Sequence, residues 1–212
     1  DVYKRQFQDS LPASFGYHPL LTDIGLVQAT ALSEDLPETV RRLNDFLPFD
    51  RQPVQRLAQR VRRLNCRLIV CDIAPLGLAV AREAGLPSVL VENFTWDWIY
   101  QDYVPYDGQM SRHAAYLQAV FTTADYHVQT EPICDRRAAD LTTLPVSRRI
   151  RTPARQVRQR LGIPDLASTV LITMGGIPWQ YTFLRQLENQ RDVYFIVPVS
   201  YTHLTLPTNR EV

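Results

Sequence analysis

The chain has 212 residues, of which 45% are hydrophobic and 21% are charged, as is usual for a globular protein. Its formal net charge of +1 argues against a general nucleic-acid-binding protein, which would show a basic excess. The sequence contains no apolar run of transmembrane length and no secretory signal pattern. Its three cysteines lack metal-ligand spacing, which favours reduced thiols and a cytoplasmic location, and peripheral membrane contact stays open.

Both ends of the chain look foreign to the rest. Residues 1–6 and 199–212 resemble translated sequencing-adapter sequence of the kind seen at the edges of metagenomic gene fragments. Lys4 is the only lysine in the sequence, and it lies within residues 1–6; all other Lys or Arg residues are arginines. The sequence therefore predicts an open-ended gene fragment with two non-native ends, and an ordinary pair of flexible termini is the alternative.

Two amphipathic helices are expected after a short strand over residues 23–28. Asp35 followed by Glu38 three positions later is typical of a helix start, and apolar residues then recur at helical spacing. A second helix is expected after Pro53, because proline interrupts the first pattern. The polar face of this second helix is rich in arginine. That face is interpreted as solvated, with a phosphate or membrane patch as the alternative.

The next stretch predicts a strand, a short helix and a second strand. Residues 67–71 form a continuous apolar run, as in a parallel strand that helices cover on both faces. Residues 89–91 form a second such run, and the short helical connection predicts neighbouring parallel strands. Ligands of such sheets bind beyond the carboxyl ends of the strands. This rule places Asp72 on one side of a crevice and the polar residues from Glu92 onward on the other.

The residues at this crevice suit a carbohydrate. Aromatic rings pack on the apolar faces of a pyranose, and Asn and Asp bind hydroxyl groups. Asp72 and Asp97 are candidate general bases for an acceptor hydroxyl, although Asp72 could instead cap the next helix. Several aromatic residues here also fit helical spacing, so core packing is the alternative for them. The candidate substrate-binding residues are Asn93, Thr95, Trp96, Tyr100 and Tyr103.

Further along the chain, residues 110–123 have helical composition and residues 125–129 could form the next strand. His127 in that strand is interpreted as structural, with a general base as the alternative. Residues 144–150 are expected to be extended, and a short arginine-rich helix follows. No pair of His, Asp or Glu has metal-ligand spacing and no G-x-S-x-G motif occurs, so neither a metal nor a nucleophilic serine is expected.

A change of composition near residue 168 predicts the start of a second domain. Residues 169–173 and 193–197 are apolar, strand-like runs. Gly175 and Gly176 lie between the first run and a helical segment, where backbone N–H groups can bind an anion. The full dinucleotide fingerprint G-x-G-x-x-G is absent, and a tight turn that needs positive φ is the alternative.

Two segments carry a family resemblance. CDIAPLGLAVAREAGLPSVLVENFTWDWIYQDY resembles bacterial glycosyltransferase-like proteins with the two-domain GT-B fold, and the glycosyltransferase-like amino-terminal half of plant arabinokinases. The shared pattern is an apolar strand, D-x-x-P, a small-residue helix, AG-x-x-SV and N-F-[TS]-W-D-x-I-Y. TPARQVRQRLGIP resembles the R-x-x-V-R-x-x-L-G-[IL] connector that precedes the carboxy-terminal domain of that family.

The resemblance implies an α/β fold. We expect a Rossmann-like parallel sheet, which is an incomplete GT-B amino-terminal domain, and the first βαβ unit of a second Rossmann-like domain. Resembling proteins place a first strand and a glycine-rich turn before this region, and both are missing from the sequence. The expected parts are the acceptor-side domain over 7–150, a linker over 151–167 and the start of the donor-side domain over 168–198, with 1–6 and 199–212 non-native.

The function implied by the resemblance is transfer of a sugar from a nucleotide-sugar donor to a sugar or lipid-linked acceptor. It needs no cofactor or metal, and Gly175 and Gly176 would face the donor diphosphate. Two alternatives stay open: the accessory half of a sugar kinase of the arabinokinase kind, and a non-catalytic sugar- or nucleotide-binding module. We expect the 212-residue chain to be inactive by itself and poorly soluble because of exposed sheet edges.

Overall fold

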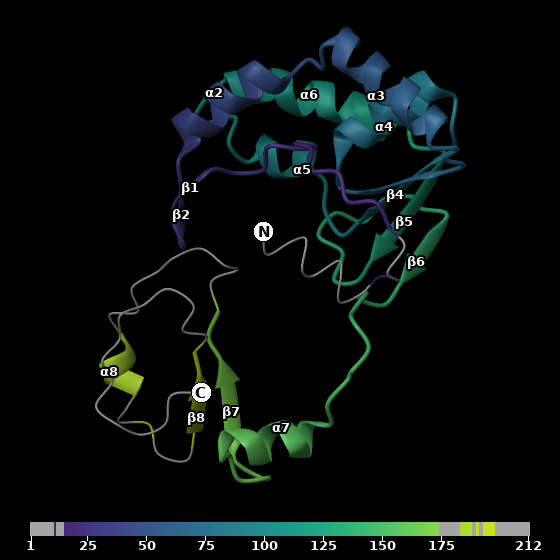
Figure 1. Cartoon of the computed structure of the whole chain (residues 1–212). Coiled ribbons are helices and arrows are strands. Elements are labelled where there is room, and N and C mark those ends of the chain that lie inside the picture. The colour runs from purple at the N-terminus through teal and green to yellow at the C-terminus, as the bar shows by residue number, and fades with distance from the viewer. Residues whose placement is uncertain (1–10, 12–14, 174–182, 188–189, 191–192, 198–212) are drawn as a thin grey trace. The chain divides into compact units, whose positions relative to one another are not determined.

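The computed structural model describes residues 11, 15–173, 183–187, 190 and 193–197. The chain divides into two compact units (Figure 1). Residues 1–27 and 35–148 belong to the first unit, and residues 28–34 and 149–212 belong to the second. No helix in the described part of the chain is both long enough and apolar enough to cross a membrane.

The first unit begins with the two expected helices, α2 (Leu36–Phe46) and α3 (Arg51–Arg63). The Asp35 carboxylate accepts a hydrogen bond of 2.9 Å from the Glu38 N–H and so caps α2, as the sequence predicts. Pro53 does not interrupt α3 but lies in its first turn, where proline's missing N–H costs nothing. The arginine-rich face of α3 is exposed, in agreement with a solvated face; its arginines include Arg56, Arg60 and Arg63.

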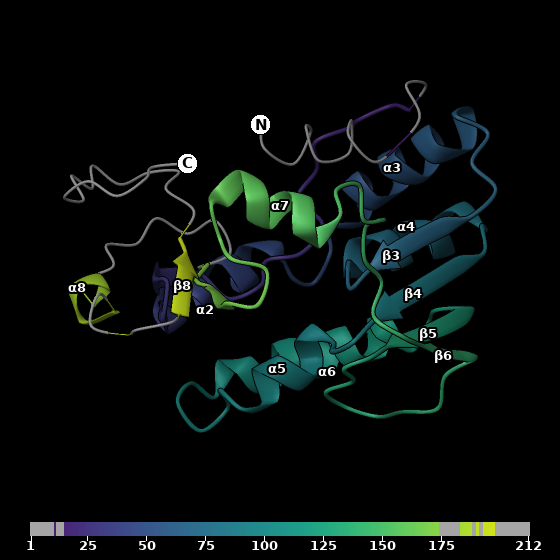
Figure 2. The same ribbon diagram turned by 90° about the horizontal axis from the view of Figure 1, so that it is seen from below.

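A four-stranded parallel sheet forms the centre of the first unit and confirms the expected α/β architecture. Its strands are β3 (Ile69–Asp72), β4 (Ser88–Glu92), β5 (Tyr126–Thr130) and β6 (Leu141–Thr143), and Figure 2 shows them side by side. The helices between them are α4 (Pro75–Ala84), α5 (Trp96–Gln101) and α6 (Gln109–Phe121). The sequence therefore predicted β3, α4, β4, α6 and β5, but no pattern in it indicated β6.

The expectation that helices cover both faces of β3 is wrong. In Figure 1, α2, α3, α4 and α6 gather on one side of the strands. Cys71 faces that helical layer and is 2% exposed, whereas Val70 on the other face is 62% exposed. β3 is also an edge strand, because the sheet order among the described strands is β3-β4-β5-β6. An apolar run can thus form a strand with one uncovered face and one unpaired edge.

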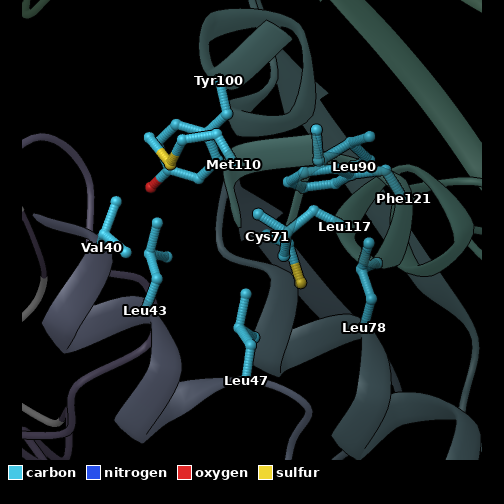
Figure 3. Close-up of a cluster of buried hydrophobic side chains, with 11 residues drawn as sticks. Val40, Leu43, Leu47, Cys71, Leu78, Leu90, Tyr100, Met110, Leu117 and Phe121 are labelled. Carbon is cyan, nitrogen blue, oxygen red and sulfur yellow. The ribbon is translucent and has the colours of Figure 1, made fainter. Parts of the chain in front are cut away.

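The main hydrophobic core lies between the sheet and this helical layer (Figure 3). Leu43 of α2, Leu78 of α4, Leu90 of β4 and Leu117 of α6 meet there, and each is at most 3% exposed. Burying a side chain of this size stabilises the fold by about 1.5–3 kcal/mol. This core fixes α5 and α6 beside the carboxyl ends of the strands, because Tyr100 and Met110 also belong to it (Figure 3).

The second unit contains a β-hairpin and a parallel strand pair. The hairpin joins β1 (Gln28–Thr30) and β2 (Ser33–Glu34), so the strand expected over residues 23–28 forms only at its last residue and beyond. The expected arginine-rich helix is present as α7, and the expected apolar runs form β7 and β8, which pair in parallel. The bounds are α7 (Ala154–Leu161), β7 (Ser168–Leu171), α8 (Leu184–Leu187) and β8 (Val193–Ile196).

Candidate functional site

The carboxyl edge of the sheet brings the predicted crevice residues to one end of neighbouring strands. Asp72 pairs in register with Val91, and Glu92 pairs with Gln129. Asp72 and Glu92 therefore end adjacent parallel strands at the same edge, as the sequence predicts. In open parallel sheets this edge is where ligands bind, and we take it as the candidate site.

Asp72 acts electrostatically on Asp23, a residue that the sequence reasoning missed. The side chain of Asp72 is exposed at the end of β3. Ala74 rather than Asp72 is the N-cap residue of α4, which removes the capping alternative. Burial raises the pKa of the half-buried Asp23, and the nearby charge of Asp72 raises it further. The only signal for Asp23 in the sequence is a charged residue at the start of an apolar segment.

The backbone directly after Asp72 is strained. Ile73 has φ of 44°, a left-handed conformation that β-branched residues rarely adopt and that costs about 1–3 kcal/mol. Its N–H donates a hydrogen bond of 3.2 Å to the Val91 carbonyl, which continues the pairing with β4 one residue beyond Asp72. The strained turn thus fixes the backbone at the point where Asp72 projects into solvent.

Trp96 and Asp97 open α5 and carry buried polar atoms without partners. Asp97 is 3% exposed, and its Oδ2 lies 3.4 Å from Arg137 Nη2. In the described part of the chain, neither Asp97 Oδ1 nor Trp96 Nε1 has a hydrogen-bond partner. The Trp96 ring packs against Gly25, where an added Cβ would lie 3.2 Å from the ring. Gly25 also has φ of 65°, so glycine is needed there for two reasons.

The other predicted substrate-binding residues divide into buried and partly exposed sets. Tyr100 is 1% exposed and donates a hydrogen bond of 3.0 Å to the Gly25 carbonyl, so its ring belongs to the core. Burial raises the pKa of Tyr100, and the charge of Asp23 raises it further. Thr95 is also buried, and its side chain does not cap α5. Asn93 and Tyr103 are half-buried beside them.

A polar network that the sequence reasoning largely missed lies at the ends of β4 and β5. The buried Glu92 Oε1 accepts hydrogen bonds from Gln129 Nε2 at 2.8 Å and from His127 Nε2 at 2.6 Å. Gln129 Oε1 accepts from the Arg137 N–H at 3.2 Å, and Arg137 Nε donates to Asp135 at 2.6 Å. We call these residues the carboxyl-edge network.

His127 and Arg137 have different roles in this network. Both ring nitrogens of His127 have partners, since Nδ1 lies 3.2 Å from the Ala138 carbonyl, and this supports the structural interpretation of His127. Burial acts against the charge of Arg137, but Asp135 and Asp97 outweigh it and raise the pKa of Arg137. Arg137 therefore stays charged and links the network to Asp97.

Two further expectations concern a metal and the donor. Within the described residues, no group of three or more His, Cys, Asp or Glu side chains is arranged to hold a metal ion. Gly175 and Gly176, the predicted diphosphate-binding residues, lie outside the described residues. The described site consequently offers carboxylates, amides and aromatic rings, a set suited to binding hydroxyl groups.

Comparison with known proteins shows distant similarity to two curated proteins. The chain is 28% identical over 163 residues to an L-arabinokinase of Arabidopsis thaliana, a match that covers 75% of the chain and 16% of that protein. It is 24% identical over 196 residues to an uncharacterized glycosyltransferase of Methanopyrus kandleri, covering 83% of the chain and 50% of that protein. The chain thus spans about half of one relative and a smaller part of the other. No family model matches the chain, and no solved structure matches it either.

Proposed function

We propose that the chain forms the acceptor-side part of a glycosyltransferase-like protein, with the acceptor sugar held at the carboxyl edge of the sheet. The observation that carries this proposal is the position of Asp72, which is exposed at the end of β3, at the same edge of the sheet as the end of β4 and the residues that follow it. A carboxylate in this position can accept the proton of a bound hydroxyl group.

In the proposed reaction, Asp72 takes the proton of an acceptor hydroxyl group. The oxygen of that hydroxyl group forms a bond to the anomeric carbon of the donor sugar. The bond between that carbon and the diphosphate oxygen breaks, and its electron pair leaves with the nucleoside diphosphate. Asn93, Trp96 and Tyr103 are proposed to bind the acceptor sugar, and the buried Thr95 and Tyr100 to position them. Gly175 and Gly176 are proposed to bind the donor diphosphate through backbone N–H groups.

The test is transfer by the full-length protein from a panel of UDP-, GDP- and dTDP-sugars. Asp72→Asn keeps the shape of the side chain but removes the base, so we expect the transfer rate to fall by about 10²- to 10⁴-fold. Asp102→Asn is the matched control. Asp102 is an exposed carboxylate directly after α5 that takes no part in the proposed reaction, and its replacement should leave the rate unchanged.

An Asp72→Asn variant with the wild-type transfer rate would refute the role of Asp72. Absence of transfer and of sugar-nucleotide hydrolysis in the wild-type protein would refute the reaction itself. In that case, retained binding of nucleotide sugars would favour the alternative of a non-catalytic binding module.

A second candidate function rests on the match to the L-arabinokinase. In that case the chain is the accessory half of a sugar kinase rather than a transferase. The sequence of the full-length protein separates the two, because a kinase adds a domain with its own glycine-rich loop for ATP phosphates. ATP-dependent phosphorylation of a free sugar would support the kinase, and transfer from a nucleotide sugar would support the proposal above.

A further inference from the structure

Trp96 and Asp97 each carry a buried polar atom without a hydrogen-bond partner among the described residues, and the proposed reaction does not explain this. Asp97 is only 3% exposed, yet one of its carboxylate oxygens has no partner among the described residues. The indole Nε1 of the preceding residue is likewise buried and unpaired. Nearly all buried polar groups in native proteins are hydrogen-bonded, so an unpaired acceptor and an unpaired donor on consecutive residues indicate a place for a ligand.

Arg137 is the group that a ligand would displace from Asp97. Its contact with Asp97 is 3.4 Å long, whereas its bond to Asp135 is only 2.6 Å. The Arg137 side chain is about one-third exposed, and the Asp97 side chain is almost completely covered. Arg137 can therefore release Asp97 and keep Asp135, and that movement would open Asp97 to a ligand.

The charge around Trp96 and Asp97 restricts the kind of ligand. Glu92, Asp97 and Asp135 supply three carboxylates at this corner, against the guanidinium of Arg137 and the imidazole of His127. Asp72 adds a further carboxylate at the end of the neighbouring strand β3. A negatively charged ligand near Trp96 and Asp97 would be repelled by these carboxylates, and little water is present there to screen the repulsion. A hydroxyl group can donate to Asp97 and accept from Trp96 without adding charge.

We infer that Trp96 and Asp97 bind hydroxyl groups of an uncharged sugar, and that the site rejects sugars carrying a carboxylate or phosphate. Asp97 Oδ1 accepts a hydrogen bond from one ligand hydroxyl, and Trp96 Nε1 donates to an oxygen of the same ligand. This inference rests on the proposed binding of a sugar at the carboxyl edge and adds its charge class. It assigns Asp97 to ligand recognition rather than to proton transfer.

The indole N–H of Trp96 gives a direct readout. In the ¹⁵N-labelled 212-residue chain, three indole signals are expected, from Trp96, Trp98 and Trp179, and Trp96→Phe identifies the first. The probes are the methyl glycosides of glucose, galactose and mannose, each compared with its uronate at equal ionic strength. We expect at least one neutral glycoside to move the Trp96 signal saturably and no uronate to do so, with the Trp98 and Trp179 signals serving as references.

Asp97→Asn tests the carboxylate itself. It preserves one acceptor oxygen but removes one of the negative charges, so the neutral glycoside should bind about tenfold more weakly and the disadvantage of the uronate should become smaller. Asp102→Asn, close by on the exposed end of α5, should change neither result. Arg137→Gln should strengthen binding of the neutral glycoside, because Arg137 no longer competes for Asp97. A purely structural role of Arg137 would not produce tighter binding.

Three results would overturn the inference: equal movement of the Trp96 signal by a glycoside and its uronate, no movement by any neutral glycoside, or unchanged selectivity in Asp97→Asn. The transfer assay with Asp72→Asn is independent of these results. A chain that fails the indole test while the full-length protein depends on Asp72 for transfer would refute only the role of Trp96 and Asp97.

Discussion

At the scale of single residues, buried polar groups are hydrogen-bonded at the amino ends of the strands but partly unpaired at their carboxyl ends. At the amino edge, Asp125 Oδ2 accepts hydrogen bonds from the Ser88 N–H at 2.8 Å and the Ser88 hydroxyl at 2.9 Å. At the carboxyl edge, Asp97 and Trp96 carry atoms without a partner among the described residues, and Ile73 is strained. A satisfied pair serves stability, whereas unpaired groups and strain cost free energy and persist where a function requires them.

His113 allows a residue-scale prediction about stability. It is 3% exposed on α6, and its Nε2 lies 2.9 Å from Asn44 Oδ1. Burial lowers the pKa of His113 and the charge of Arg112 lowers it further, against the opposing effect of Asp107. The unfolded chain, with the ordinary histidine pKa of 6.5, therefore binds more protons than the folded chain. The free energy of unfolding should fall as the pH drops below 6.5 toward the lowered pKa.

Urea unfolding measured between about pH 7 and pH 5 checks this expectation. His113→Gln should remove much of the decrease, because glutamine keeps a hydrogen-bonding side chain and does not titrate in this range. His18→Gln is the matched control, since His18 is exposed, and it should leave the decrease in place. A decrease of the same size in His113→Gln as in the wild type would contradict the assignment.

At the scale of elements, the close approach of α4 to β3 depends on Gly77. A Cβ at this position would lie 2.5 Å from Cys71 Sγ, so the buried Cys71 side chain, the helix or the strand would have to shift. Replacing a glycine inside a helix by alanine normally stabilises by about 0.5–1 kcal/mol. Overpacking in a core costs about 1–3 kcal/mol, so the clash should decide the sign.

Gly77→Ala is therefore expected to lower the free energy of unfolding, as measured by urea denaturation. The control is Gly108→Ala, because no atom lies within 4 Å of the Cβ position at Gly108. Adding Cys71→Ala to Gly77→Ala removes the sulfur that clashes, so the double variant should be more stable than the sum of the two single effects predicts. Additive effects would show that Cys71 does not limit the approach of α4.

The sequence predicted best those features that depend on residues close together in the chain, such as helix caps and strands. Asp35 capped its helix as expected, and Asp72 came to the edge beside the residues that follow β4, because period and capping depend on near neighbours. Gln129 and Arg137 could not be predicted, since their partners lie up to 40 residues away in the chain. Asp23 lies in a segment for which the sequence predicts a strand but which has no regular structure at residues 23–27, so the pattern could not place Asp23 at the site.

At the scale of the whole molecule, the first unit has an incompletely covered sheet. The N–H groups of Ile69 and Ile73 donate hydrogen bonds to the carbonyl groups of Pro87 and Val91 on the β4 side. Because successive residues of a strand direct their backbone groups to opposite sides, the N–H and C=O of Val70 point away from β4. No described strand lies on that side. An apolar groove of about 340 Å³ borders this edge, and its lining includes Leu20, Leu57, Val61, Leu68, Val70 and Leu76.

This uncovered edge predicts that the isolated chain associates with itself. Natural edge strands carry charges, prolines or bulges that prevent pairing, but residues 68–71 have neither charge nor proline, and Val70 is 62% exposed. Val70→Lys places a charge in the middle of the edge and should increase the monomer fraction in sedimentation velocity. Val146→Lys is the matched control, because Val146 is 80% exposed but outside the sheet. An equal effect of both variants would show that net charge, rather than the β3 edge, controls association.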